Sequence, residues 1–301
     1  MAGDATPRFA LVLGAGGTVG EAFHRGVLRA MHEVGLDPRS AAVVVGTSAG
    51  SIVAASIRRR QAPDPATPVT ERARPGRLRD RAAALAVYRR PRQALNALLL
   101  SPEFANGRTS AEFIAQALRD RHGERWPDAP LWIVAVRRAD GRRVVFGRPG
   151  EPVTDVGSAV AASCAIPAYF SAVDIDGTAY VDGGVHSPTN ADLLSSQDLD
   201  LVVISSPMSV RPSAVRRPRV DLPLRLLFHQ YLREEVWALR RRGDTVVTIE
   251  PDEAVLGRTG LNMMDGRRIV EIEQHAYEVA CRELRRVRTG RPAHPVPPRA
   301  G

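Results

Sequence analysis

Residues 42–50 read Ala-Val-Val-Val-Gly-Thr-Ser-Ala-Gly, a β-branched run that breaks at a glycine and continues in small residues. The run predicts a buried strand that ends at Gly46, and residues 48–57 predict a helix. Gly46-Thr47-Ser48-Ala49-Gly50 therefore has the form G-x-S-x-G on a turn between a strand and a helix. Such a turn projects its serine hydroxyl outward, so Ser48 is a candidate nucleophile. The alternative is an ordinary tight turn with an N-capping serine.

A glycine cluster precedes this turn in the chain. Residues 9–13 form an apolar run that leads into Gly14-Ala15-Gly16-Gly17-Thr18-Val19-Gly20, and helix-like sequence follows to about residue 34. The two runs predict strand, turn, helix, strand, turn, helix, which is the pattern of a parallel pair in an α/β sheet. Backbone amides at the start of the first helix are the donors that an oxyanion needs.

The same amides could bind a pyrophosphate, which would make the loop part of a nucleotide- or cofactor-binding module. Gly14, Gly16 and Gly20 give G-x-G-x-x-x-G, not G-x-G-x-x-G. The second strand also ends without the acidic residue that would hold a ribose. The spacing therefore favours an oxyanion loop, and we expect no cofactor.

A carboxylate follows a predicted hairpin over residues 173–181. Asp182-Gly183-Gly184 places an aspartate at a strand end, with glycines that open space around it. Asp182 could accept a serine proton directly, although an aspartate in a glycine turn is more often structural. A catalytic histidine, His186 or His229, is the alternative. Hydrolases with the order serine, acid, histidine build several strands before the serine, whereas one strand is predicted here.

The rest of the chain extends the α/β pattern into one domain over residues 8–288. The predicted elements are helices at 110–121, 156–163 and 267–286, a hairpin at 131–136 and 144–146, and strands at 201–205 and 246–249. Residues 58–107 are rich in Arg, Pro and Ala and predict an inserted flexible loop with a cap helix over 78–100. Residues 289–301 predict a disordered tail.

The order of Gly-rich loop, G-x-S-x-G and D-G-G resembles the patatin-like phospholipases. Stretches 26–28, 162–170 and 180–190 are similar to that family as well, so the resemblance covers residues 8–207. It implies a three-layer α/β/α sandwich with a mostly parallel central sheet, and hydrolysis of a lipid or lipid-like ester by a phospholipase A type of serine acyl-ester hydrolase. The implied site is a Ser48 and Asp182 dyad, an oxyanion hole from Gly16, Gly17 and Thr18, and motif glycines Gly14, Gly46, Gly50, Gly183 and Gly184.

One position departs from the family pattern. The family loop usually carries Arg or Lys before its last glycine, where this chain has Val19. Arg25 is a candidate to supply the missing cation. A catalytically silent scaffold with the same fold is the alternative that Val19 raises.

Charge and composition bear on the partners. All 42 basic residues are arginine, against 33 acidic residues, and the formal charge of +9 favours anionic partners. Residues 222–239 have apolar residues near helical spacing with arginines among them. This pattern fits a basic helix in peripheral contact with an anionic membrane, and it also fits an ordinary helix packed on the sheet, which is the commoner case. We expect no nucleic-acid partner, and the sequence leaves the oligomeric state open.

Cysteine content and hydropathy bear on location. Cys164 and Cys281 lie far apart without metal-ligand spacing, which indicates reduced thiols and no metal. The chain has no leader-like start and no apolar run of the ~18 residues that a membrane span needs. We therefore expect a cytoplasmic protein, with peripheral membrane contact as the extension that the 222–239 pattern allows.

Overall fold

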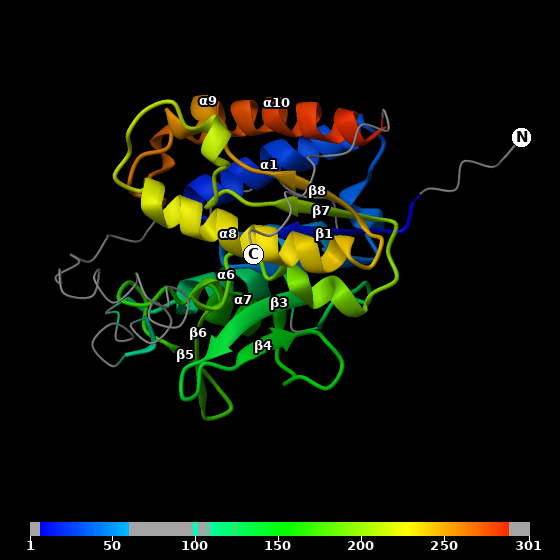
Figure 1. Cartoon of the computed structure of the whole chain (residues 1–301). Coiled ribbons are helices and arrows are strands. Elements are labelled where there is room, and N and C mark those ends of the chain that lie inside the picture. Colours follow the sequence, from blue (N-terminus) through cyan, green and yellow to red (C-terminus); the bar gives the residue numbers. More distant parts are fainter. Residues whose placement is uncertain (1–6, 60–98, 102–106, 108, 124, 289–301) are drawn as a thin grey trace, which may run out of the picture.

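The computed structural model describes residues 7–59, 99–101, 107, 109–123 and 125–288 of the chain. Within them, an eight-stranded mixed sheet is covered by helices on both faces (Figure 1). The cap helix expected over 78–100 lies outside the described residues except for its last two positions. The tail over 289–301 also lies outside them.

The strand order is β5-β6-β3-β2-β1-β7-β8, with β4 paired to β3. The parallel strands are β1 (Phe9–Leu13), β2 (Val43–Thr47), β3 (Leu131–Arg137), β7 (Leu201–Ser205) and β8 (Thr245–Ile249). The antiparallel strands are β4 (Arg143–Phe146), β5 (Val173–Ile175) and β6 (Thr178–Asp182). The mostly parallel central sheet expected from the sequence is confirmed.

Side chains alternate across the sheet, because successive residues of a strand point to opposite faces. In β1, Phe9, Leu11 and Leu13 enter the larger core, whereas Ala10 and Val12 enter the smaller one. The helices that cover the larger core are α1 (Gly17–Glu33), α2 (Ala49–Ile57), α6 (Glu112–His122), α7 (Val156–Ser163) and α10 (Ile269–Arg288). Helix α8 (Leu222–Arg240), drawn in yellow in Figure 1, covers the smaller core with η3 (Ala191–Ser196). The α/β/α sandwich is thus confirmed.

Helix α8 packs on the sheet through its second half. Leu232 and Leu239 are buried in the smaller core, and Tyr231 and Arg225 are buried as well. Leu224, in the first turn, is 41% exposed. The packed-helix interpretation therefore describes most of α8, whereas Pro223 and Leu224 in its first turn face solvent. None of the described helices is long and apolar enough to cross a membrane.

Strand β1 lies where the strand order reverses. The chain passes from β1 through α1 to β2 and β3 on one side, whereas β7 and β8 extend the sheet on the other. Helices α1 and α8, which follow β1 and β7, cover opposite faces. Open α/β sheets bind ligands outside the carboxyl ends of strands at such a switch point. The fold therefore points to the loops after β1, β2 and β7.

Strand β3 presents one edge to both β2 and β6. Residues 131–134 of β3 pair with β2, and residues 135–137 pair with β6. Strand β4 pairs with residues 133–136 and so occupies the opposite edge. Because β6 is antiparallel to β3 and β2 is parallel to it, the carboxyl ends of β2 and β6 meet on this edge. Thr47 and Asp182 consequently lie opposite the consecutive β3 residues Val134 and Ala135.

The glycines of the G-x-S-x-G turn let α2 pack directly on the strands. A Cβ at Gly50 would lie 2.0 Å from the carbonyl oxygen of Leu13, and one at Gly46 would lie 2.6 Å from the Cα of Ser51. Both obstructing atoms belong to the backbone, so no side-chain rotation relieves the clash.

We predict that Gly50→Ala lowers the free energy of unfolding by about 3 kcal/mol or more, since overpacked sites that cannot relax lie at the high end of such costs. Chemical denaturation followed by circular dichroism measures the change. Gly260→Ala is the matched control, because its Cβ would have nothing nearer than 3.9 Å. An unfolding free energy within about 0.5 kcal/mol of wild type is expected for the control. Equal stability of the two variants would contradict the packing argument.

Candidate active site

Ser48 lies between β2 and α2 in a strained conformation. Its φ of 53° and ψ of −123° fall in a region that non-glycine residues rarely adopt, at a typical cost of about 1–3 kcal/mol. The Ser48 amide donates to Ser163 Oγ at 2.9 Å, and Ser51 Oγ donates to the Ser48 carbonyl at 2.6 Å. These two bonds hold the turn in its strained geometry.

Asp182 lies at the end of β6, where its carboxyl interacts with the Ser48 side chain. Its carboxylate also accepts the Gly184 amide at 2.7 Å, and its own amide donates to the Ala165 carbonyl at 3.0 Å. Burial raises the pKa of the Asp182 carboxyl to about 6, although the bonds from Ser48 and Gly184 act in the opposite direction. The structure therefore places Ser48 and Asp182 next to each other, and burial makes the Asp182 carboxylate more basic than that of an ordinary aspartate.

The end of α7 anchors both residues. Ser163 Oγ accepts the Ser48 amide and donates to the Val134 carbonyl at 2.6 Å, and Ala165 accepts the Asp182 amide. Cys164 lies between them, and burial, reinforced by the Asp182 carboxylate, raises the pKa of its thiol well above the usual value. Residues 162–170 resemble the family in sequence, but the sequence predicts no role for Ser163. Its contacts with the Ser48 turn and with β3 join residues that are far apart in the chain, so they leave no local pattern.

Backbone hydrogen bonds hold the Gly-rich loop on both sides of Gly16 and Gly17. The amides of Gly14, Ala15, Val19 and Gly20 donate to the carbonyls of Ser205, Pro188, Met263 and Gly16, respectively. Gly16 caps α1, and Gly17 begins it with a φ of 56°, which favours glycine. Among the described residues, the Gly16 and Gly17 amides have no backbone acceptor, as expected at a helix start. Thr18 follows in the first turn and is fully buried.

His24 fixes the loop from beneath. Its Nε2 donates to the Gly14 carbonyl, and its Nδ1 accepts from Ser205 Oγ, both at 2.8 Å. Burial lowers the pKa of His24 to about 4, so the ring is neutral at pH 7. His229, one of the two histidines weighed as catalytic, instead contacts Glu250 through Nδ1 at 2.7 Å.

The remaining motif glycines are needed for close approach. A Cβ at Gly183 would lie 2.3 Å from the Val134 carbonyl oxygen, and one at Gly14 would lie 3.0 Å from the Pro188 carbonyl oxygen. A Cβ at Gly184 would lie 3.0 Å from the Asp182 carboxylate. The glycines flanking the candidate base therefore let it reach the β3 edge.

A buried polar network supports the site from the α8 face. Asn190 Nδ2 lies 3.2 Å from Thr47 Oγ1 and 3.4 Å from the Gly183 carbonyl oxygen, so it bridges the turns that carry Ser48 and Asp182. Glu235 of α8 holds the loop that contains Asn190, and it accepts bonds from Ser187 Oγ, Thr189 Oγ1 and the Ala191 amide. Burial raises the pKa of Glu235. No sequence signal identified Glu235, because its partners lie far away in the chain.

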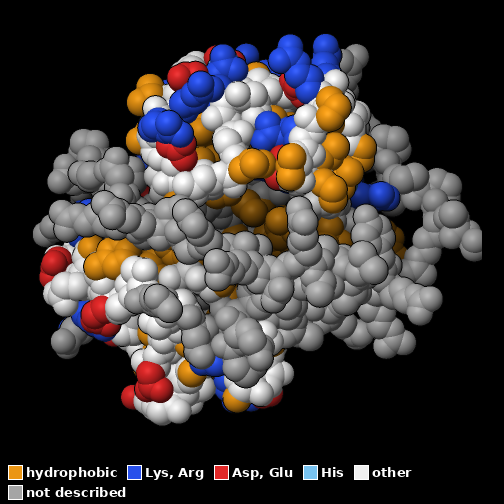
Figure 2. All heavy atoms as spheres, turned by 90° about the vertical axis from the view of Figure 1, so that its left-hand side faces the viewer, with side chains coloured by type: hydrophobic (Ala, Val, Ile, Leu, Met, Phe, Trp, Pro, Cys, Tyr) orange, Lys and Arg blue, Asp and Glu red, His pale blue; other side chains and the backbone are white. Residues whose placement is uncertain are grey.

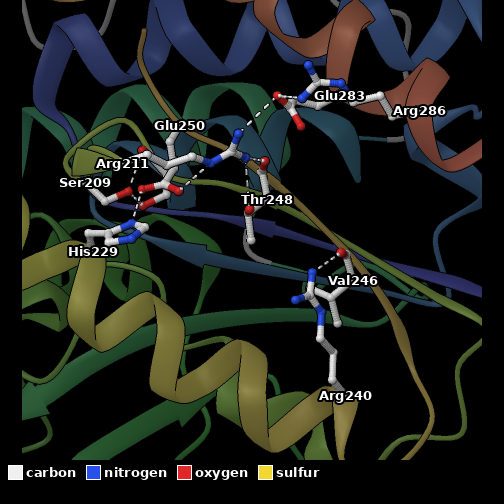
Figure 3. Close-up of polar contacts among 10 residues, drawn as sticks. Ser209, Arg211, His229, Arg240, Val246, Thr248, Glu250, Glu283 and Arg286 are labelled. Carbon is white, nitrogen blue, oxygen red and sulfur yellow. Dashed lines mark hydrogen bonds and ion pairs between the residues drawn. The ribbon is translucent and has the colours of Figure 1, made fainter. Parts of the chain in front are cut away.

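The segment after β7 supports the Gly-rich loop from outside. Pro207 packs so closely that a Cβ at Gly16 would lie 2.8 Å from its ring. Further along, Arg211 donates to Glu250 at 3.2 Å, to Glu283 at 3.1 Å and to the Thr248 carbonyl at 2.7 Å (Figure 3). This network joins β8 and α10 to the segment, and His229 adds α8.

The two arginines near the loop have different positions. Arg25 pairs with Glu273 of α10 at 2.9 Å and so lies on the α1–α10 contact. Arg225 is buried and donates to the Pro207 carbonyl at 2.9 Å, with Met263 Sδ at 3.6 Å and an ion pair to Asp221 at 2.6 Å. Pro207 and Met263 both contact the Gly-rich loop, so Arg225 lies behind this loop, whereas Arg25 pairs with α10.

The chain is similar in sequence to curated proteins of two mycobacteria. Uncharacterized NTE family proteins of Mycobacterium tuberculosis and Mycobacterium bovis are 32% identical over 209 residues, which cover 68% of this chain and 50% of theirs. The chain thus spans about half the length of the curated relatives that it matches.

Two solved structures are similar at low identity. The first is VipD from Legionella pneumophila, with a TM-score of 0.41, 11% identity and coverage of 93% of this chain and 67% of that one. The second is the type III effector ExoU, with a TM-score of 0.38, 17% identity and coverage of 93% and 53%. The family description "patatin-like phospholipase" matches residues 11–195, a stretch that contains the Gly-rich loop, the Ser48 turn and Asp182. This chain belongs to the patatin-like phospholipase family.

Proposed function

We propose that this protein is a serine acyl-ester hydrolase of lipid-like substrates, with Ser48 as nucleophile and Asp182 as base. The observation that carries the proposal is that the Ser48 side chain, at the start of α2, interacts with the buried carboxyl of Asp182. Ser48 Oγ attacks the ester carbonyl carbon while its proton passes to Asp182. The alcohol leaves with that proton, and water then cleaves the acyl-enzyme by the same route.

The amides of the Gly-rich loop would stabilise the oxyanion that this attack creates. Gly16 and Gly17 begin α1, whose positive dipole end adds to their effect. The bonds from Gly14 and Ala15 to the neighbouring loops hold these amides in place before substrate arrives. Such preorganisation is the source of oxyanion stabilisation, and one donor is typically worth about 10²–10³ in turnover. We assign Thr18 as the third donor from its place in the same turn.

The basicity of Asp182 suits the role of general base. A group works best as a base when its pKa lies near the working pH, and burial moves the pKa of Asp182 to about 6. Above that pH the carboxylate is ionised and can take the serine proton without a histidine. The lipid character of the substrate and the phospholipase A type of reaction follow from the family and from the basic surface, with the cytoplasmic side of a membrane as the place of action.

Ser163 acts in this proposal as a positioning residue. Its hydroxyl links the Ser48 amide to the β3 backbone, so it fixes the position of Ser48 relative to the end of β6, where Asp182 lies. The linkage is buried, and its loss would leave an amide and a carbonyl without their partner.

We predict that Ser48→Ala lowers turnover of p-nitrophenyl esters by roughly 10⁴-fold or more, as expected when a nucleophile is removed. It should also abolish covalent labelling by a fluorophosphonate. Asp182→Asn should cost about 10²–10⁴-fold, the usual range for a general base. Ser56→Ala is the control, because its hydroxyl donates within α2 to the Ile52 carbonyl. Persistent labelling of Ser48→Ala would refute the assignment, and a folded wild type that never labels would favour a silent scaffold.

We predict a pH dependence set by Asp182. Because the base must be ionised, kcat/KM for a soluble ester should rise with pH through about 6 and level off above it. Steady-state rates in buffers of constant ionic strength measure the profile. A midpoint near the ordinary aspartate pKa of about 3.9 would show that burial does not tune this group.

We predict that Ser163→Ala lowers kcat about tenfold or more with little change in KM, since small displacements of a nucleophile are costly. It should also lower the free energy of unfolding by about 1–3 kcal/mol, the cost of an unsatisfied buried polar group. Steady-state kinetics and urea denaturation give the two values. An unchanged kcat together with reduced stability would limit Ser163 to a structural role.

A further inference from the structure

Three exposed apolar side chains gather beside the candidate site. Val220 is 85% exposed, Leu224 41% and Leu261 68%. They lie on the segments 211–225 and 256–268, and we call the three residues the apolar rim. Figure 2 views the molecule from the left-hand side of Figure 1, where the β3 arrow ends. The upper part of this face shows hydrophobic side chains together with arginines. Solvent-exposed residues of this type in a cluster indicate an interaction surface.

Hydrogen bonds join the two segments into one surface. Arg219 donates to the Leu256 carbonyl at 2.6 Å and to the Thr259 carbonyl at 3.0 Å. Arg225 reaches Met263 Sδ at 3.6 Å, and Asp221 pairs with both arginines. Val220 and Leu224 are therefore held next to the segment that carries Leu261.

The same surface is joined to the Gly-rich loop. The Val19 amide donates to the Met263 carbonyl at 3.0 Å, and a Cβ at Gly17 would lie 2.8 Å from Met264 Sδ. Met263 follows Leu261 closely in the chain. The apolar rim is thus fixed beside the first turn of α1, where the oxyanion amides lie.

The charge around the apolar rim has one dominant sign. Segments 211–225 and 256–268 together contain eight arginines and two aspartates. Arg216, Arg217 and Arg268 are exposed. Exposed apolar side chains among arginines match the interface of an anionic bilayer, where apolar groups enter the acyl region and cations meet the headgroups.

We propose that the apolar rim docks this protein on an anionic lipid surface. Docking there would place the start of α1 and Ser48 toward the bilayer, so that an acyl ester reaches the site from the membrane. The proposal rests on the proposed function for its purpose, but membrane binding can be measured without catalysis. The sequence raised membrane contact for the 222–239 helix as a whole. The proposal limits that contact to the first turn of the helix and to the neighbouring segment 256–268.

The test uses the full chain and sedimentation with two kinds of vesicle, phosphatidylcholine alone and phosphatidylcholine mixed with phosphatidylglycerol. We expect wild type to bind the mixed vesicles, and salt to weaken that binding because the arginines contribute to it. The triple variant Val220→Ser/Leu224→Ser/Leu261→Ser should bind at least about tenfold more weakly, since partition scales with buried apolar area. Arg216→Ser/Arg217→Ser should reduce the preference for the mixed vesicles.

Val153→Ser is the matched control. Val153 is 88% exposed, but it lies after β4, which runs antiparallel to β3 and so ends toward the amino end of β3, away from the carboxyl end of β2 that leads to Ser48. Its vesicle binding should equal that of wild type. All these variants change exposed side chains, so each should keep the wild-type melting temperature and the wild-type turnover of a soluble ester.

Two results would overturn the docking proposal. Wild type could fail to bind mixed vesicles while hydrolysing a soluble ester, or the triple variant could bind as tightly as wild type. Self-association in solution that the triple variant abolishes, without vesicle binding by wild type, would assign the apolar rim to a second copy of the chain and likewise refute lipid docking. If wild type does not hydrolyse a soluble ester, that result counts against the proposed function alone, because vesicle binding is measured in a separate experiment.

Discussion

The candidate site depends on one edge of β3 that pairs with two strands. The backbone of residues 131–137 hydrogen-bonds first with β2 and then with β6, so the carboxyl ends of two strands that are far apart in the chain meet on it. Ser48 and Asp182 are brought together by this backbone pairing before any side chain acts. Backbone ladders are rigid and set register residue by residue, so the spacing between the Ser48 turn and Asp182 is set by the same bonds that hold the sheet.

The elements around this edge are held by buried polar bonds, which need full satisfaction in a low-dielectric interior. Ser163 links the Ser48 turn to β3, Asn190 links the turns after β2 and β6, and Glu235 links α8 to the loop that contains Asn190. His24 remains neutral, because burial lowers its pKa to about 4, and so it adds hydrogen bonds without adding charge. Asp182 is thus a buried acid with its pKa raised, and its usual solvation is replaced by one amide and one hydroxyl. Desolvation by burial therefore makes this carboxylate more basic than that of an ordinary aspartate.

Local patterns in the sequence are enough to predict the fold and the two candidate reacting residues, Ser48 and Asp182. The apolar runs of the strands and the G-x-S-x-G turn are each signals within a few residues, and each of them predicted an element that the structure contains. The contacts that complete the site are not local. Ser163 contacts Ser48 across 115 positions, and Glu235 contacts Ala191 across 44. A serine or glutamate on a helix gives no sign of such a partner, so these residues could be found only once the elements were packed.

The position of Val19 shows how a local departure from a family pattern can be offset by packing. Its side chain is buried in the larger core, and its amide is held by the Met263 carbonyl. Arg225 brings a guanidinium behind the same loop from α8, but Asp221 pairs with it at 2.6 Å. An ion pair this close has a weak net field at a distance, because opposite charges cancel. Arg225 therefore acts on the loop through the Pro207 carbonyl and Met263, by fixing the two residues that press on Gly16 and Gly17. In the proposed reaction, stabilisation of the oxyanion therefore falls to the backbone amides of the loop.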